Sequence, residues 1–138
     1  MKKILLLIFI ILVFVGKINA QVAVIANKNV PIDKITKAQL FDYYSGDIKY
    51  WYNSKPIIVF DIKPKLEIKE NFYEYIAKNT ARMKSIWMKK MLSGEGDPPE
   101  AVKSEEEMVH KVETTSGAIG FVSLSKVKGN VKTLLIIK

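Results

Sequence analysis

The stretch that decides the fold of this chain is SGAIGFV at residues 116–122. It combines a Gly-x-x-Gly turn with an apolar segment that has the composition of a β-strand. Two further marked stretches precede it, LFDYYSGDIKYW at residues 40–51 and MLSGEGDPP at residues 91–99. These three stretches, in this order, are the fixed points around which the remaining elements are assigned.

Short apolar runs predict further strands. Residues 22–26 form a continuous, partly β-branched run, which is typical of a strand buried on both faces. Residues 57–60 follow Pro56 and predict a second strand, and residues 131–137 predict the last one. Runs this uniformly apolar favour a sheet that is covered on both sides.

Helices are predicted between these strands. Thr36 and Gln39 have the spacing of a capping box, as do Ser104 and Glu107, and Gly46 suits the left-handed residue that ends a helix. Strands that alternate with helices predict an α/β fold with a mixed sheet flanked by helices and containing parallel strand pairs. The helices are expected to be amphipathic, with core-facing apolar residues at helical spacing, which are Leu40, Phe41 and Tyr44; Ile68, Phe72, Tyr75 and Ile76; Met83, Ile86, Trp87 and Met91; and Met108, Val109 and Val112.

Residues 1–20 have the pattern of a secretory signal peptide. Lys2 and Lys3 form a short basic start, residues 4–15 are an unbroken apolar run, and Ala20 is the small residue that signal peptidase requires. The run is shorter than the roughly 20 residues that a helix needs to cross a bilayer, so no membrane span is expected after cleavage. We therefore expect a periplasmic or secreted protein with a signal peptide at 1–20 and one domain at 21–138.

The composition excludes several classes of protein. There is no cysteine, which excludes disulfides and a lipid anchor on an N-terminal cysteine. The formal net charge is +8, but Lys2, Lys3 and Lys17 lie in the predicted signal peptide, and the other lysines are mixed with acidic residues. This pattern is typical of a solvated surface, and we expect no nucleic-acid partner.

The stretches at 40–51, 91–99 and 116–122 together resemble the phosphate-binding subunit family of bacterial ABC transporters. The resemblance covers nearly all of the chain after residue 21. It implies a single lobe of the periplasmic-binding-protein type, in which residues 22–30 enter the lobe and residues 117–122 leave it as hinge strands. It also implies that a second protein is needed to complete a closed ligand cleft.

The ligand loop of that family follows the second strand and places Ser, Gly and Thr residues around phosphate at a helix N-terminus. Here the corresponding segment is DIKPKLEIK at residues 61–69, which contains none of these three residue types. Lys63, Lys65 and Lys69 nevertheless keep this region electropositive, and a lysine attracts an anion as a point charge. The candidate ligand-binding residues are these three lysines and, by the resemblance, Gly117. The alternative is that the lysines are simply solvated.

The sequence shows no catalytic or metal-binding set. His110 has no cysteine or second histidine at ligand spacing, and the glutamates at 105–107 suit the first turn of a helix. We therefore expect no enzyme activity, no cofactor and no metal. Residues 94–99 are interpreted as a turn between helices, although the family resemblance would make them a lip over the cleft. About three of the five aromatic residues at 43–44 and 50–52 are expected to lie in the core.

Two functions of different class fit these patterns. The first is an exported binding protein for phosphate or another oxyanion that serves a transporter or a membrane sensor protein. The second is a periplasmic interaction module with a degenerate ligand site, which binds a protein partner through an exposed apolar patch. Saturable anion binding distinguishes the first function from the second.

Overall fold

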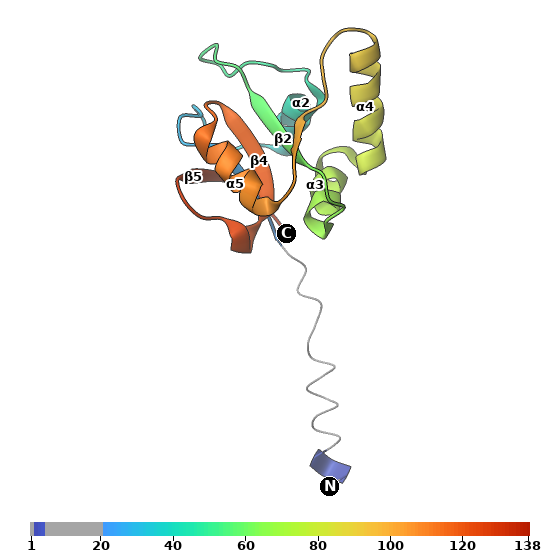
Figure 1. The fold of residues 1–138 in the computed structure, drawn as a ribbon, viewed down its shortest axis with the longest axis vertical. Coiled ribbons are helices and arrows are strands. Elements are labelled where there is room, and N and C mark those ends of the chain that lie inside the picture. Colours follow the sequence, from blue (N-terminus) through green and yellow to red (C-terminus); the bar gives the residue numbers. More distant parts are fainter. Residues whose placement is uncertain (1, 5–20) are drawn as a thin grey trace.

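The computed structural model describes residues 2–4 and 21–138, and its centre is a five-stranded mixed sheet. The strands are β1 (Val22–Asn27), β2 (Ile58–Ile62), β3 (Glu100–Val102), β4 (Ala118–Ser123) and β5 (Val131–Ile137). They lie in the order β3-β2-β4-β1-β5 (Figure 1). β1 pairs antiparallel with β4 and β5, whereas β2 pairs parallel with β3 and β4. The predicted α/β fold with a mixed sheet and parallel pairs is confirmed.

Helices cover both faces of this sheet. In the segment 21–138 they are α2 (Lys37–Ser45), α3 (Glu67–Ala77), α4 (Thr80–Leu92) and α5 (Glu105–Thr114), with a 3-10 turn at Leu124–Lys126. A side chain at Gly120 of β4 would meet Met108 and Val112, so this face of the sheet is covered by α5. The next residue, Phe121, points to the opposite face and stacks on Phe72 of α3, with ring centroids 4.0 Å apart. α4 lies outside this layer and packs mainly against α3 and α2 (Figure 1).

The predicted signal peptide falls, apart from residues 2–4, outside the described residues. Within the part of the chain that the structure describes, no helix is both long and apolar enough to cross a membrane. The strands, the covering helices and the buried core residues all lie within residues 22–137. Residues 21–138 therefore carry a complete hydrophobic core of their own.

The strand predictions hold best where burial is greatest. Residues 22–26 of β1 are buried on both faces, as their apolar run predicts. β2 begins one residue after the predicted run at 57–60 and continues to Ile62. β3 has only three residues and was not predicted, because it is defined by its parallel pairing with β2 rather than by a local pattern.

The helix termini follow the predicted capping residues. At the start of α2, the Gln39 amide donates to Thr36 Oγ1 at 3.2 Å and the Thr36 amide donates to Gln39 Oε1 at 2.9 Å. Gly46 ends this helix with a φ of 79°. At α5 only half of the predicted box forms. Ser104 accepts from the Glu107 amide, but the Glu107 carboxylate accepts from the amide of Lys103 instead of Ser104.

An aromatic cluster joins the helices to the sheet. The Tyr44 ring meets that of Phe72 edge to face at 4.9 Å, and Trp87 Nε1 donates to the Tyr44 carbonyl at 2.7 Å, which fixes α4 to α2. Tyr44 and Trp51 are buried and Tyr43 packs against the core, so the expected division of these aromatic residues is confirmed. The prediction that Met91 faces the core is wrong, because α4 buries Met83 and Trp87 and turns Met91 to solvent.

Candidate functional site

The three lysines that the sequence singles out line one cavity of about 270 Å³. Lys63 and Lys65 lie in the loop after β2, and Lys69 lies in the first turn of α3. The cavity is completed by Glu70 of α3 and by residues from the start of α4, namely Thr80, Ala81 and Lys84. We call it the basic cavity, since it gathers four lysines and one carboxylate.

Local structure explains why these side chains meet. The Lys63 amide donates to the Val102 carbonyl at 2.8 Å, so the loop leaves β2 while still fastened to β3. α3 then begins without any side-chain cap at Leu66, but Glu67 and Glu70 lie in its first turn, where carboxylates compensate the positive end of the helix dipole. After a short connection, Asn79 caps α4 by accepting from the Arg82 amide at 2.8 Å, and Thr80 opens that helix.

Lys69 differs from the other lysines of the cavity because it is nearly buried and already paired. Its ammonium donates to the Ile62 carbonyl at 2.7 Å and lies 3.4 Å from Asp61 Oδ2. Asp61 in turn accepts from the Tyr73 hydroxyl at 2.7 Å. Burial, and next the Asp61 charge, raise the pKa of Tyr73 well above its ordinary value, which keeps this hydroxyl a donor. The charge that reaches the cavity therefore comes chiefly from the other three lysines.

Gly117 lies at the opposite end of the sheet. β2 and β4 run parallel with Ile58 opposite Ala118, so Gly117 stands beside the start of β2, whereas Lys63 follows its end. The Gly117 carbonyl accepts from Trp51 Nε1 at 3.1 Å. Its φ is +75°, and a Cβ there would lie 2.3 Å from the Pro56 carbonyl oxygen. The structure thus gives Gly117 a packing role and does not bring it together with the lysines.

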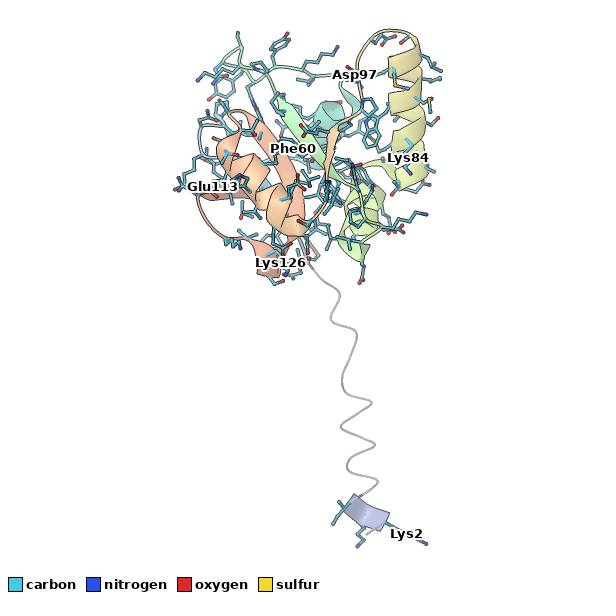
Figure 2. The ribbon with its side chains drawn as sticks, viewed as in Figure 1. Lys2, Phe60, Lys84, Asp97, Glu113 and Lys126 are labelled. Carbon is cyan, nitrogen blue, oxygen red and sulfur yellow. The ribbon has the colours of Figure 1, made fainter. Side chains whose placement is uncertain are left out.

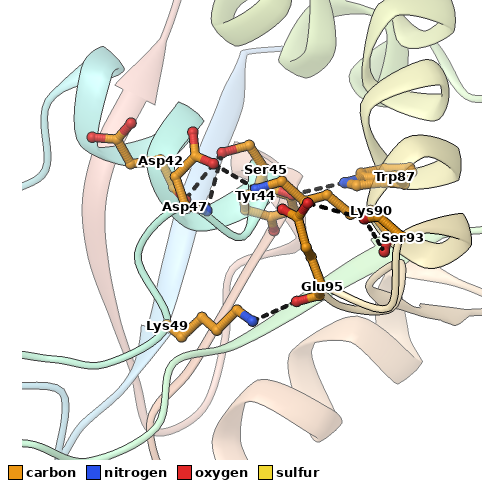
Figure 3. A network of polar contacts seen from close by, with 9 residues as sticks. All are labelled: Asp42, Tyr44, Ser45, Asp47, Lys49, Trp87, Lys90, Ser93 and Glu95. Carbon is orange, nitrogen blue, oxygen red and sulfur yellow. Dashed lines mark hydrogen bonds and ion pairs between the residues drawn. The ribbon is translucent and has the colours of Figure 1, made fainter.

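A second cavity of about 340 Å³ lies near Gly117's end of the sheet, between α2, the end of α4 and the turn at 94–97. Figure 3 shows the polar contacts around it. Lys49 Nζ donates to the Glu95 carbonyl at 2.6 Å, and Lys90 Nζ donates to Asp47 Oδ1 at 2.5 Å. The hydrogen bond from Lys90 lowers the pKa of Asp47. These contacts fasten the turn to the body of the domain, and the ammonium groups of Lys49 and Lys90 are both bound to groups of the protein itself.

We find no metal site in the part of the chain that the structure describes. Among residues 2–4 and 21–138 there is no group of three or more His, Cys, Asp or Glu side chains that is placed to hold a metal ion. His110 is exposed on α5. The arrangement with the clearest chemistry is therefore the basic cavity, whose lining has more cationic than anionic side chains.

The edge of the sheet that carries the basic cavity has a special position in the fold. β1 begins there and β4 ends there, since Val22 pairs with Ser123 and β2 runs parallel to β4. The Leu124 amide donates to the Gln21 carbonyl at 2.8 Å, so the start of β1 and the end of β4 lie side by side at this edge, and the chain then returns to the sheet as β5. These strands belong to the segments that the family resemblance interprets as hinge strands.

A family model for the PBP superfamily domain matches residues 19–134. The chain belongs to the PBP superfamily. This membership and the mixed sheet confirm the predicted periplasmic-binding-protein fold. No curated protein matches the sequence.

Solved structures of similar fold come from transport proteins. A putative phosphate ABC transporter substrate-binding protein from Clostridium perfringens, with bound phosphate, is 21% identical with a TM-score of 0.67, and the match covers 83% of this chain and 45% of that one. An ABC-type phosphate transport receptor from Vibrio cholerae is also 21% identical, with a TM-score of 0.65 and coverage of 83% and 46%. This chain spans less than half the length of these structures.

Four members of the basic cavity are missed by reasoning from the sequence, namely Glu70, Thr80, Ala81 and Lys84. Thr80 and Lys84 belong to α4, which is separated from the Lys63 loop by the whole of α3. In the sequence Lys84 is one polar position of an amphipathic helix, one turn after Thr80 and Ala81, and no spacing relates it to the three predicted lysines. Lys84 reaches the cavity because α4 packs against α3, and this is a tertiary contact that the local sequence does not reveal.

Proposed function

We propose that this chain is an exported, periplasmic or secreted, substrate-binding lobe whose basic cavity binds a small oxyanion, with phosphate the first ligand to test. The observation that carries the proposal is the gathering of four lysines and Thr80 around one cavity with a single carboxylate, Glu70. Three of these lysines, Lys63, Lys65 and Lys84, are exposed and form no salt bridge with the residues that the structure describes.

The chemistry of the cavity indicates a weak and salt-sensitive site. Lysines attract phosphate as point charges and lack the planar fork with which arginine binds two oxygens at once. The Thr80 hydroxyl adds one neutral hydrogen-bonding group. Glu67 and Glu70 in the first turn of α3 oppose an anion, which keeps the net attraction small. We therefore expect affinity that falls as ionic strength rises.

The fold supports the same proposal. The C. perfringens structure is of a substrate-binding protein that holds phosphate, which makes phosphate the natural first ligand for this chain. The basic cavity lies at the edge where the hinge strands enter and leave, so a ligand there is accessible to a second protein that covers this edge. We propose an ABC transporter or a membrane sensor protein as that partner, and we propose no catalytic activity.

Thermal unfolding of residues 21–138 with and without millimolar phosphate tests the proposal, with sulfate in parallel and ionic strength held constant with chloride. Specific binding stabilises the folded state by about 2.7 kcal/mol at one hundred times Kd, which raises Tm by several degrees for a domain of this size. The matched variants are Lys65→Ala in the cavity and Lys28→Ala, an exposed lysine in the turn after β1. A phosphate-dependent rise that Lys65→Ala diminishes and Lys28→Ala retains supports the proposal. Equal small rises with all salts contradict it.

A second function is favoured by one observation, the pairing of Lys69 with Asp61. This pair removes one of the three predicted lysines from ligand binding, which is what a degenerate ligand site would look like. In that case the lobe serves as an interaction module and binds its partner through another surface. The two functions are separated by the phosphate experiment, because an interaction module shows no phosphate-selective rise in Tm.

A further inference from the structure

The outer face of α4 is an exposed apolar stripe. α4 stands at the margin of the molecule, and its inner face is held by Met83 and Trp87 (Figure 1). On the outer face, Met88, Met91 and Leu92 keep 53%, 45% and 79% of their surface exposed. Their spacing of three and four residues places them on one side of the helix. We call these three residues the α4 stripe.

Positive charge accompanies the α4 stripe. The helix reads TARMKSIWMKKML, with four basic residues and no acidic one. Arg82 lies over the Phe41 ring and Lys90 is paired with Asp47, whereas Lys84 and Lys89 are exposed and have no such partner among the described residues. Lys84 precedes Met88 by one helical turn and therefore shares its face. Figure 2 shows Lys84 on α4, and this side chain also lines the basic cavity.

We propose that the outer face of α4 docks on the surface of a membrane that contains anionic phospholipid. A helix with cations and exposed apolar side chains on one face binds such an interface, because it reaches headgroup phosphates and the acyl boundary together. Lysine stems reach the headgroup region while their apolar parts stay against the stripe. Methionine suits contact with lipid, since its flexible side chain adapts to irregular apolar surroundings.

The shape of the surface favours a membrane over an acidic protein. Protein partners anchor aromatic or aliphatic side chains in well-packed pockets at the centre of an interface. The α4 stripe lines neither the basic cavity nor the cavities on either side of α4. It is a raised row of side chains on a helix at the edge of the domain, and a lipid interface needs no complementary pocket to receive it.

Few groups take part, so the binding is weak and reversible. Three apolar side chains and two exposed lysines provide far less attraction than an inserted helix. Screening by salt weakens the contribution of the lysines. The inference stands apart from the proposed function, since it requires no anion in the basic cavity.

Vesicle co-sedimentation of residues 21–138 tests the inference. The vesicles contain phosphatidylglycerol mixed with phosphatidylcholine, or phosphatidylcholine alone. The stripe variant is Met88→Ser with Met91→Ser and Leu92→Ser, and its matched control is Ile136→Ser, an apolar residue on β5 that is 43% exposed. The charge variant is Lys89→Glu, with Lys28→Glu as its control. Thermal unfolding of each variant verifies that it is folded.

We expect binding to the anionic vesicles only, weakened by added salt. Removing one cation near such a surface weakens binding by about fivefold, and charge reversal at Lys89 exceeds this. The stripe variant loses binding, while Ile136→Ser and Lys28→Glu bind like the parent. Absence of binding to anionic vesicles overturns the inference, and so does a folded stripe variant that binds like the parent. A chain that ignores vesicles but binds a purified acidic protein through the stripe replaces the membrane with a protein partner.

Discussion

The ammonium of Lys69 lies 3.4 Å from Asp61 Oδ2, and both side chains are nearly buried at the end of β2. Lys69 lines the basic cavity, and the pair is held further by the Tyr73 hydroxyl, which donates to Asp61, and by the Ile62 carbonyl, which accepts from Lys69. Removing only one partner of such a buried pair costs stability, because the charge of the other partner is left buried and uncompensated. The positive charge that Lys69 brings to the basic cavity is thus partly neutralised by Asp61.

Removing one partner of this pair is expected to destabilise the fold. Asp61→Asn and Lys69→Met should each lower the free energy of unfolding by about 3 kcal/mol, because each leaves a buried charge without its counter-ion. The double variant should recover much of that loss, since neither charge remains. Urea denaturation of the three variants measures the coupling. Additive losses would show that the pair does not form in solution.

The same pair predicts a change in anion binding. In Asp61→Asn the ammonium of Lys69 lacks a counter-ion, and an oxyanion in the basic cavity supplies one. Phosphate should therefore raise the Tm of folded Asp61→Asn by more degrees than it raises that of the parent. Lys69→Met controls for lost stability, since it is destabilised but offers no extra cation. A larger rise in Lys69→Met than in Asp61→Asn would contradict this expectation.

Gly117 is predicted to matter for stability and not for phosphate. Gly117→Ala forces a Cβ against the Pro56 carbonyl oxygen in addition to the cost of a positive φ. We expect a loss of about 3 kcal/mol or more in the free energy of unfolding. Gly94 has the same φ of +75° with no heavy atom within 4 Å of the added Cβ, so Gly94→Ala isolates the backbone cost of about 1 kcal/mol. Equal losses in both variants would remove the packing explanation.

Stability should fall in alkaline solution through the buried tyrosines. Burial, followed by the Asp61 charge, raises the pKa of Tyr44 and Tyr73 above the ordinary value of about 10. A raised folded pKa means that the stabilisation is complete below the unfolded pKa and is lost as pH rises through the folded one. Unfolding free energy measured against pH should decline above about pH 10, and less steeply in Tyr73→Phe. An unchanged slope in that variant would assign the decline to other groups.

The sequence predicts the elements whose signals are local. The apolar run of β1 and the capping box of Thr36 specify their elements within a few residues, and both are observed. β3 escapes prediction because its three residues become a strand only by pairing with β2. Met91 was assigned to the core because helical spacing does not tell which of two apolar stripes on α4 faces inward.

For the candidate site, the sequence identifies the lysine-containing loop but not which of its lysines is paired with a carboxylate. Lys63 and Lys65 are found where the segment after β2 predicts them, and Lys69 lines the same cavity. Nothing local shows that Asp61 pairs with Lys69, since they are eight residues apart and meet only after the chain turns from β2 into α3. Lys84 joins the cavity through the packing of α4 on α3, which periodicity does not specify.

The most direct test of the central claim is a calorimetric titration of residues 21–138 with phosphate at low ionic strength, made on the parent and on a variant that combines Lys63→Ala and Lys65→Ala. An oxyanion site in the basic cavity predicts a saturable isotherm with one phosphate per chain, weakened by about tenfold or more in the variant, with Lys28→Ala unaffected. An isotherm that does not saturate, or one that the double variant shares with the parent, would contradict the claim.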